Sequence, residues 1–263
     1  MSRQTEEPPA TTRSERVQSL ERGLSVLKAF TARDGGLTIS EVAERTRLTR
    51  ATARRLLLTL AELGYVEADR REFRLKEQVL DLAKPFTGPD DPWAFAEPYL
   101  QSLTDRLGES ASIAVLDGTD ILYVARTPTR RLMTLNVSVG SRLPSHATSK
   151  GRVLLSFLPS NELDSYLKRS AIARYTNRTV ADAEQLRAVL AEVREQGWAI
   201  VDQQLEEGLC SVAAPLVGPD GRVSAAISVC AHAGRIDPAT LATEFLPLVL
   251  ETARRISAVW NRR

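Results

Sequence analysis

The chain has 263 residues, a formal net charge of +2, and 43% hydrophobic and 26% charged residues. This is ordinary globular composition, and the length suits two domains better than one. Its two cysteines, Cys210 and Cys230, are too few for a disulfide framework and belong to no metal-like cluster. No apolar run approaches the roughly 20 residues of a membrane span, and the N-terminus lacks a signal-peptide core, so we expect a cytoplasmic protein with no membrane contact.

The first part of the chain begins with a polar stretch, residues 1–16, which we expect to be a disordered tail. A helix should follow, with Ser19 as its cap and with Leu20, Leu24 and Leu27 at helical spacing. Its apolar stripe should pack beneath the segment that comes next.

Residues 37–75 predict a helix, a tight turn, a second helix and a β-hairpin, which together form a winged helix-turn-helix. Thr38 and Glu41 have the spacing of a capping box, and Thr49 is placed to cap the second helix. Gly64 is typical of a helix stop. The second helix should bury a stripe at spacings of three and four: Ala53, Leu56, Leu57 and Leu60.

Arginine is concentrated around the second helix, where five arginines and no acidic residue occur between positions 45 and 61. The N-terminal end of such a helix is the part that enters a DNA major groove. The alternative is a packed helical segment with a solvated basic face. We predict DNA binding, with base-edge contacts near the helix start and phosphate contacts from the hairpin tip, by Arg50, Ala51, Thr52, Arg54, Arg55, Arg70 and Arg71.

The segments SLERGLSVLKAF and LTISEVAERTRLTRATARRLLLTLAELGYV resemble the N-terminal domain of IclR-type bacterial transcription regulators, and the resemblance covers nearly all of residues 17–260. Residues 126–155 resemble the subgroup that controls aromatic-acid catabolism through the β-ketoadipate pathway. Two departures stand out: Arg47 replaces a usual turn glycine, and Thr49-Arg50-Ala51 replaces Pro-x-Ser. The resemblance implies a homodimer on a double-stranded DNA operator, and it leaves open whether dimers pair into tetramers.

Beyond the winged helix-turn-helix, taken as residues 17–76, we expect a linker helix and hinge at 77–92 and a second domain at 93–263. Helices and strands alternate there without internal repeats, which predicts an α+β domain, and the resemblance implies a GAF-like effector-binding fold. The expected strands are 111–116, 121–125, 132–139, 198–201, 211–216 and 222–230. The expected helices are 93–107, 147–158, 161–168, 183–196 and 237–260.

A turn dense in small polar residues, 143–152, precedes one of these helices. The unpaired N–H groups at a helix start favour a carboxylate, and Gly151 would let a ligand or another backbone come close. The alternative is a helix start capped by Thr148 or Ser145 and solvated by water.

The resemblance implies that an effector binds between the sheet and this helix start, with Ser149 and Lys150 acting through their backbone N–H groups. Small polar side chains on strands also fit close packing against a helix, so that alternative stays open. Four arginines are candidates for pairing with a carboxylate: Arg126, Arg130, Arg131 and Arg142. The predicted ligand-binding set is His146, Ser149, Lys150, Leu209, Ser211, Ser228, Cys230 and Arg142.

The chain lacks the sequence motifs of hydrolases, nucleotide-binding enzymes and zinc proteases, so we expect neither an enzyme nor a cofactor or metal site. We predict a regulator that senses a small aromatic or dicarboxylic acid of the protocatechuate, 4-hydroxybenzoate or β-ketoadipate class. The alternatives are a regulator of an unrelated small-carboxylate pathway and a sensor that acts through protein contacts alone.

Overall fold

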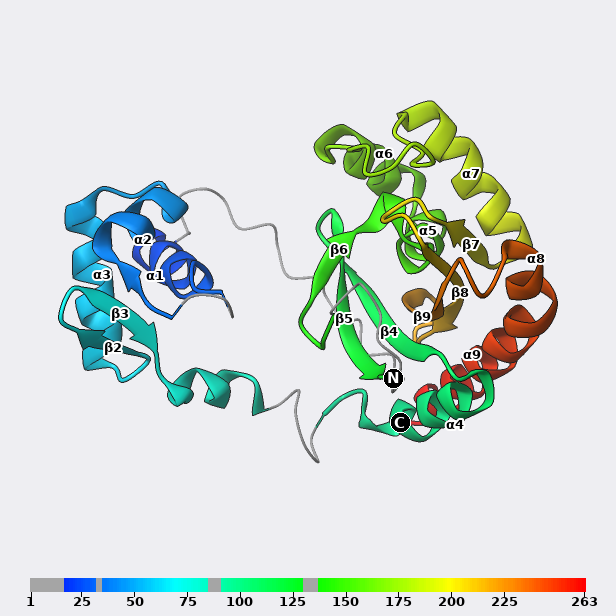
Figure 1. The fold of residues 1–263 in the computed structure, drawn as a ribbon, viewed down its shortest axis with the longest axis horizontal. Helices are drawn as coiled ribbons and strands as arrows, with labels where there is room; N and C mark the ends of the chain where they lie inside the picture. The colour runs from blue at the N-terminus through cyan, green and yellow to red at the C-terminus, as the bar shows by residue number, and fades with distance from the viewer. Residues whose placement is uncertain (1–16, 32–34, 85–90, 130–136) are drawn as a thin grey trace, which may run out of the picture. The chain divides into compact units, whose positions relative to one another are not determined.

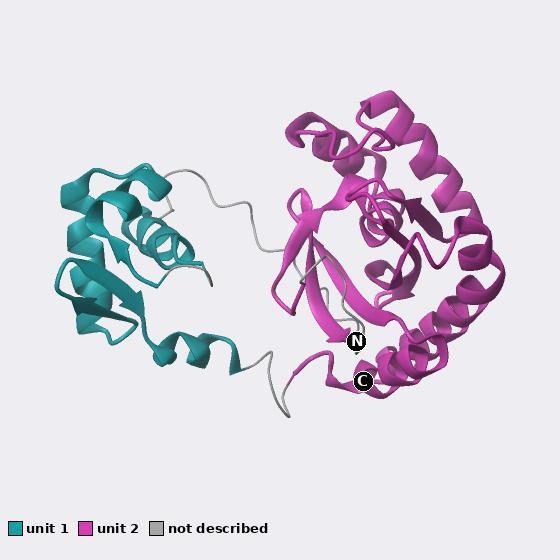
Figure 2. Cartoon of the chain, viewed as in Figure 1, with its two compact units in different colours: residues 1–90 teal, residues 91–263 magenta. Residues whose placement is uncertain are grey.

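The computed structural model describes residues 17–31, 35–84, 91–129 and 137–263, so the predicted tail lies outside the described residues. The chain divides into two compact units, residues 1–90 and 91–263 (Figure 2). The division falls inside the segment predicted as a hinge. None of the described helices combines the length and the apolar composition that a bilayer crossing requires.

Three helices form the core of the first unit: α1 (Gln18–Lys28), α2 (Ile39–Thr46) and α3 (Arg50–Glu62) (Figure 1). Val26, Val42 and Leu57 are fully buried between them. The predicted Ser19 cap is wrong, because Val17 holds the N-cap position and no side chain caps α1. The helix therefore depends on its packing against α2 and α3 for stability.

The capping box at the start of α2 is confirmed: Glu41 N donates to Thr38 Oγ1 at 3.3 Å, and Thr38 N donates to Glu41 Oε2 at 2.8 Å. The turn to α3 passes through Arg47, which adopts the left-handed conformation with φ 55°. A glycine would take this conformation at no steric cost, so Arg47 carries backbone strain. Thr49 caps α3 by accepting from Thr52 N at 3.2 Å.

A three-stranded antiparallel sheet completes the first unit, in the order β1 (Leu37–Thr38), β3 (Glu72–Leu75), β2 (Val66–Asp69). The hairpin of β2 and β3 was predicted, whereas β1 was not. Asp69 pairs with Glu72, so Arg70 and Arg71 alone form the turn. The predicted linker helix is a 3₁₀ helix, η1 (Glu77–Leu82), and not an α-helix.

The second unit is built on a six-stranded sheet in which every pairing is antiparallel, in the order β6-β5-β4-β9-β8-β7. Five strands match predicted ones. Part of the predicted strand 132–139 lies outside the described residues, its remainder is not a strand, and β6 was missed. The strands are β4 (Ser110–Asp117), β5 (Asp120–Thr127), β6 (Arg142–Pro144), β7 (Ala199–Asp202), β8 (Leu209–Val217) and β9 (Val223–His232).

Helices cover both faces of this sheet (Figure 1). One face packs against α4 (Glu97–Leu107), which follows η3 (Ala94–Ala96), and against the C-terminal helix. That helix begins as α8 (Pro238–Thr240), passes through a π-helical turn at η5 (Leu241–Phe245) and continues as α9 (Leu246–Trp260).

The other face carries α5 (Ser149–Ser156), which follows η4 (Ser145–Ala147), and beyond it α6 (Ser160–Arg169) and α7 (Ala183–Gln196). Every residue of α5 is buried. Its N-terminus therefore meets the middle of the sheet, and the whole unit is the α+β arrangement that the sequence predicted.

Candidate ligand cavity and nucleic-acid surface

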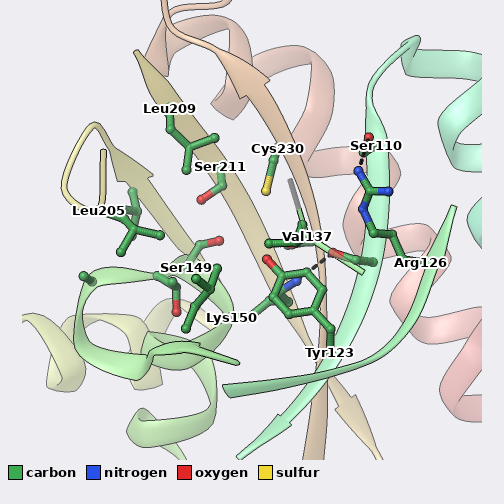
Figure 3. Close-up of a pocket in the computed structure, with 16 residues that line it drawn as sticks. Ser110, Tyr123, Arg126, Val137, Ser149, Lys150, Leu205, Leu209, Ser211 and Cys230 are labelled. Atoms are coloured by element: carbon green, nitrogen blue, oxygen red, sulfur yellow. Dashed lines mark hydrogen bonds between the residues drawn. The ribbon is translucent and has the colours of Figure 1, made fainter. Parts of the chain in front are cut away.

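A cavity lies between the sheet of the second unit and the N-terminal end of α5; we call it the α5 cavity (Figure 3). Its floor comes from β4, β5, β8 and β9, and Leu205 reaches it from the loop before β8. The lining residues are Ser110, Ser112, Tyr123, Arg126, Val137, Leu143, Ala147, Thr148, Ser149, Lys150, Val201, Leu205, Leu209, Ser211, Ser228 and Cys230.

Strand register gathers the small polar side chains of the floor. Ser110 lies opposite Cys230, which in turn lies opposite Ser211, so three neighbouring strands place one polar residue each in a single row. Ser112 lies opposite Ser228 in the parallel row two residues along. Because residues two apart on a strand share a face, both rows point into the α5 cavity.

A β-bulge brings Tyr123 and Arg126 to the same face of β5. These residues are three apart, and a regular strand would place them on opposite faces. The pairing with β4 shifts between Ile113 and Ala114, so that Ser112 pairs with Arg126 while Ala114 pairs with Tyr123. The extra residue of the bulge thus aims both side chains into the cavity.

The turn into α5 needs a glycine, because Gly151 lies directly against the backbone of Ser145. A Cβ at this position would lie 2.1 Å from the Ser145 carbonyl oxygen. Thr148 caps the helix by accepting from Gly151 N at 3.2 Å. Within the described part of the chain, no acceptor contacts the backbone N–H groups of Ser149 and Lys150, which leaves two donors at the cavity.

Lys150 is the most unusual residue of the cavity, since its side chain is only 2% exposed. Its Nζ donates to Ser112 Oγ at 2.6 Å and lies 3.5 Å from the centre of the Tyr123 ring. Burial lowers the pKa of Lys150 to about 7, with a smaller opposing effect from Cys230. Burial also raises the pKa of the Tyr123 hydroxyl. The fully buried hydroxyl of Ser228 has no hydrogen-bond partner among the described residues.

A second buried cation holds the loop that contributes Leu205. Arg152 Nε donates to the His146 carbonyl oxygen at 3.0 Å, and its guanidinium also donates to Gln204 Oε1. Gln204 Oε1 accepts from Val180 N at 3.1 Å as well. Gln204 therefore makes polar contacts to both Arg152 and Val180, and these fix the loop beside the cavity.

Six of the eight predicted ligand-binding residues line the α5 cavity: Ser149, Lys150, Leu209, Ser211, Ser228 and Cys230. His146 does not, because its Nε2 lies 2.9 Å from the Ala173 carbonyl oxygen and its ring packs near Tyr175. Arg142 does not either, since it is exposed and pairs with Asp117. Of the other arginines considered, Arg126 lines the cavity, while Arg130 and Arg131 lie outside the described residues.

Sequence reasoning missed Tyr123 and the two serines of β4, Ser110 and Ser112. The serines carried a usable signal, because two hydroxyls two residues apart on a strand must share one face. Tyr123 carried none, since its direction depends on the bulge. Among the described residues, no group of three or more His, Cys, Asp or Glu side chains could hold a metal ion.

The first unit presents an arginine surface made by α3 and the turn of the β2–β3 hairpin: Arg50, Arg54, Arg55, Arg70 and Arg71, all exposed. In the described part of the chain, none of these five guanidinium groups has an acidic or hydrogen-bonding partner. By contrast, Arg74 lies 3.6 Å from both Asp69 and Glu72. The five free guanidinium groups are therefore available to an external anion.

Two uncharged members of the predicted DNA-contacting set differ in exposure. Ala51 is exposed, whereas Thr52 is half-buried and its hydroxyl lies 2.9 Å from the Thr49 hydroxyl. Thr52 and Arg55 also border a groove between α1 and α3. The Thr52 hydroxyl therefore takes part in hydrogen bonding at the start of α3.

Comparison with known proteins matches residues 92–258 to the bacterial transcriptional regulator IclR C-terminal domain and residues 19–70 to the IclR helix-turn-helix domain. The Pca regulon regulatory protein of Pseudomonas putida is 43% identical over 90% of this chain and 81% of its own length. The p-hydroxybenzoate hydroxylase transcriptional activator of Acinetobacter baylyi is 32% identical over 91% and 90%.

A crystal structure of a protein from Rhodococcus sp. RHA1, described as a transcriptional regulator, is 44% identical. It has a TM-score of 0.79 and covers 93% of this chain and 98% of its own. Both family domains are thus matched in the expected order, and similar proteins align over nearly the full length of the chain. The chain therefore belongs to the IclR family of bacterial transcriptional regulators.

Proposed function

We propose that this protein is a cytoplasmic regulator of aromatic-acid catabolism genes that binds operator DNA through its first unit and a small organic acid through its second. The α5 cavity carries the proposal: it joins two unpaired backbone N–H groups, a buried cation and an unpartnered hydroxyl to apolar walls. Such a combination suits a carboxylate attached to an apolar or aromatic body. The names of the two relatives, a Pca regulon regulator and a p-hydroxybenzoate hydroxylase activator, support the aromatic-acid class.

On the DNA side, we propose a homodimer that places two α3 helices in successive major grooves, about 34 Å apart on a near-palindromic site. The N-terminal end of α3 then meets base edges through Arg50, Ala51, Thr52 and Arg54. Arg55, Arg70 and Arg71 hold phosphates and set the register of the protein on the duplex. Pairing of dimers into tetramers would double the number of half-sites that are bound.

On the ligand side, we propose that the acid enters the α5 cavity with its carboxylate towards Ser149, Lys150 and Ser228. Its apolar body then packs against Leu209 and the other apolar walls, beside the row formed by Ser211 and Cys230. A dicarboxylic acid would use Arg126 for its second carboxylate, since guanidinium groups bind carboxylates in a bidentate manner. His146 and Arg142 are left out of the proposed contacts because neither lines the cavity.

A binding experiment tests this function directly. Purified protein is titrated into a labelled duplex from the DNA upstream of its own gene, and fluorescence anisotropy is measured without acid and with protocatechuate, 4-hydroxybenzoate or β-ketoadipate. We expect specific binding of the duplex and a change of at least fivefold in its Kd with one of the acids, as is typical of allosteric coupling. If the protein binds no duplex, the alternative of a sensor that acts through protein contacts would be favoured. Specific binding of the duplex that none of the three acids changes would contradict the aromatic-acid assignment.

A further inference from the structure

Among the described residues, the lining of the α5 cavity carries positive but no negative charge. It includes Lys150 and Arg126 and no aspartate or glutamate. The ammonium group of Lys150 is held instead by a neutral hydroxyl, Ser112 Oγ at 2.6 Å, and by the face of the Tyr123 ring, with Nζ 3.5 Å from the ring centre. A buried cation is costly when no anion compensates it, so the empty cavity disfavours the charged form of this lysine.

The geometry also shows where a compensating anion would sit. Figure 3 shows Lys150 beside Tyr123 and pointing towards the cavity, with Ser211 and Cys230 across from it. Ser228, whose buried hydroxyl lacks a partner, belongs to the same lining. Since the N–H groups of Ser149 and Lys150 are also unpaired, a carboxylate there would meet several donors together.

We propose that the Lys150 ammonium is the ion-pair partner of the effector's carboxylate, and that effector binding is coupled to the uptake of one proton by Lys150. This rests on the proposed function of the cavity, and it assigns to the side chain a role that sequence reasoning gave only to the backbone N–H. The effector binds as its carboxylate anion, and the proton comes from the solvent to the free amine of Lys150.

Proton uptake makes the affinity depend on pH. Burial lowers the pKa of Lys150 to about 7, so the amine is mostly neutral at pH 8 in the empty cavity. A bound carboxylate raises this pKa again, because an opposite charge at close range favours the charged form. The effector's Kd should then rise by about tenfold for each pH unit above 7 and should stay nearly constant below pH 6.

Among the described residues, the other titratable or charged groups facing Lys150 are Tyr123 and Arg126 on β5 and Cys230 on β9. Burial raises the pKa of Tyr123, so this hydroxyl stays protonated throughout the range of the test. The Cys230 thiol also lines the α5 cavity, so it needs a control variant of its own.

The test is calorimetric titration of the full-length protein with 4-hydroxybenzoate, protocatechuate and β-ketoadipate, in phosphate and in imidazole buffer. The difference between the two buffers gives the number of protons taken up. For an acid that binds, we expect about 0.9 protons per site at pH 8 and about 0.1 at pH 6, as follows from a pKa near 7. Whatever its affinity for the acid, the Cys230→Ser variant should take up the same number of protons per bound acid.

Two variants of Lys150 distinguish the effect of its charge on effector binding from the effect of its proton exchange. Lys150→Met should weaken binding by more than tenfold at pH 6 and abolish proton uptake, whereas Lys168→Met, which removes an exposed lysine of α6, should change neither. Lys150→Arg keeps a permanent charge, so any binding it retains should take up no proton at pH 8. The wild-type measurements stand even if a variant does not fold.

Binding with no proton uptake at pH 8, or uptake that persists in Lys150→Met, would overturn the role of Lys150 and leave the cavity as the effector site. If proton uptake is lost only in Cys230→Ser, the proton is assigned to the thiol, and the role proposed for Lys150 is likewise overturned. If none of the three acids binds at either pH, both this inference and the aromatic-acid assignment fail.

Discussion

At the scale of single residues, the buried Lys150 lowers the stability of the folded chain, and in our proposal it binds the effector. In the unfolded chain this lysine has its usual pKa near 10.5, and in the folded chain burial lowers the pKa to about 7. Between these values the unfolded state binds more protons, so the lysine's destabilising effect is complete below pH 7 and is relieved as the pH rises towards 10.5.

We therefore expect Lys150→Met to be more stable than the wild type at pH 7, because it removes a buried charge that no acidic side chain of the described residues compensates. This advantage should shrink at pH 9.5, where the wild-type lysine is neutral in the folded state. Denaturant midpoints of the two proteins, without effector at both pH values, measure this difference. Equal advantages at pH 7 and pH 9.5 would contradict a neutral buried amine.

Gly151 is a second residue whose identity is dictated locally. A methyl group there would meet the Ser145 carbonyl oxygen at 2.1 Å, so Gly151→Ala must displace the turn before α5. We expect a loss of about 1–3 kcal/mol of stability, the usual cost of overpacking. The matched control is Gly23→Ala in α1, where a Cβ would meet nothing within 4 Å and alanine should be neutral or stabilising. Equal melting temperatures for the two variants would refute the close approach.

At the scale of elements, α3 should carry sequence recognition. Arg54 is exposed on this helix and has no partner in the described chain, so Arg54→Ala should weaken operator binding by about 1–3 kcal/mol if it pairs with one base. Binding to single-base operator variants would show relaxed preference at that position. Arg55→Ala is the control, since loss of a phosphate contact weakens all sequences alike. An unchanged preference at every position would remove Arg54 from the recognition set.

The hairpin turn should contribute phosphate contacts. Arg70 occupies a left-handed position with φ 53°, which asparagine tolerates, so Arg70→Asn removes the charge and keeps the turn. The slope of log affinity against log salt should fall by about 0.9 units. Arg74→Gln provides the control. Because Arg74 already pairs with Asp69 and Glu72, this variant should leave the slope unchanged. Equal slopes for Arg70→Asn and the wild type would place the wing away from DNA.

The elements also show how far sequence could predict this protein. Local sequence patterns correctly predicted the Thr38 capping box, the Thr49 cap and the bounds of α7, because each depends on residues a few positions apart. Strands β1 and β6 form through pairing with strands that are distant in the sequence. They are two and three residues long and carry no sequence pattern of their own. The cavity face of β5 could not be predicted either, since a bulge sets the direction of Tyr123.

At the scale of the whole molecule, membership of the IclR family confirms the prediction of a transcription regulator and not an enzyme. The arginine surface and the α5 cavity belong to separate compact units of the chain. An effector can change DNA binding only by the ratio of its affinities for the DNA-bound and free forms. The same ratio must then appear when DNA is the ligand that changes effector binding.

The measurement that tests this coupling most directly is the complete cycle: the operator's Kd with and without saturating effector, and the effector's Kd with and without saturating operator, at one pH and one salt concentration. The account predicts that both ratios equal the same factor, of at least about fivefold. An effector that fills the α5 cavity and leaves the operator's Kd unchanged would contradict it.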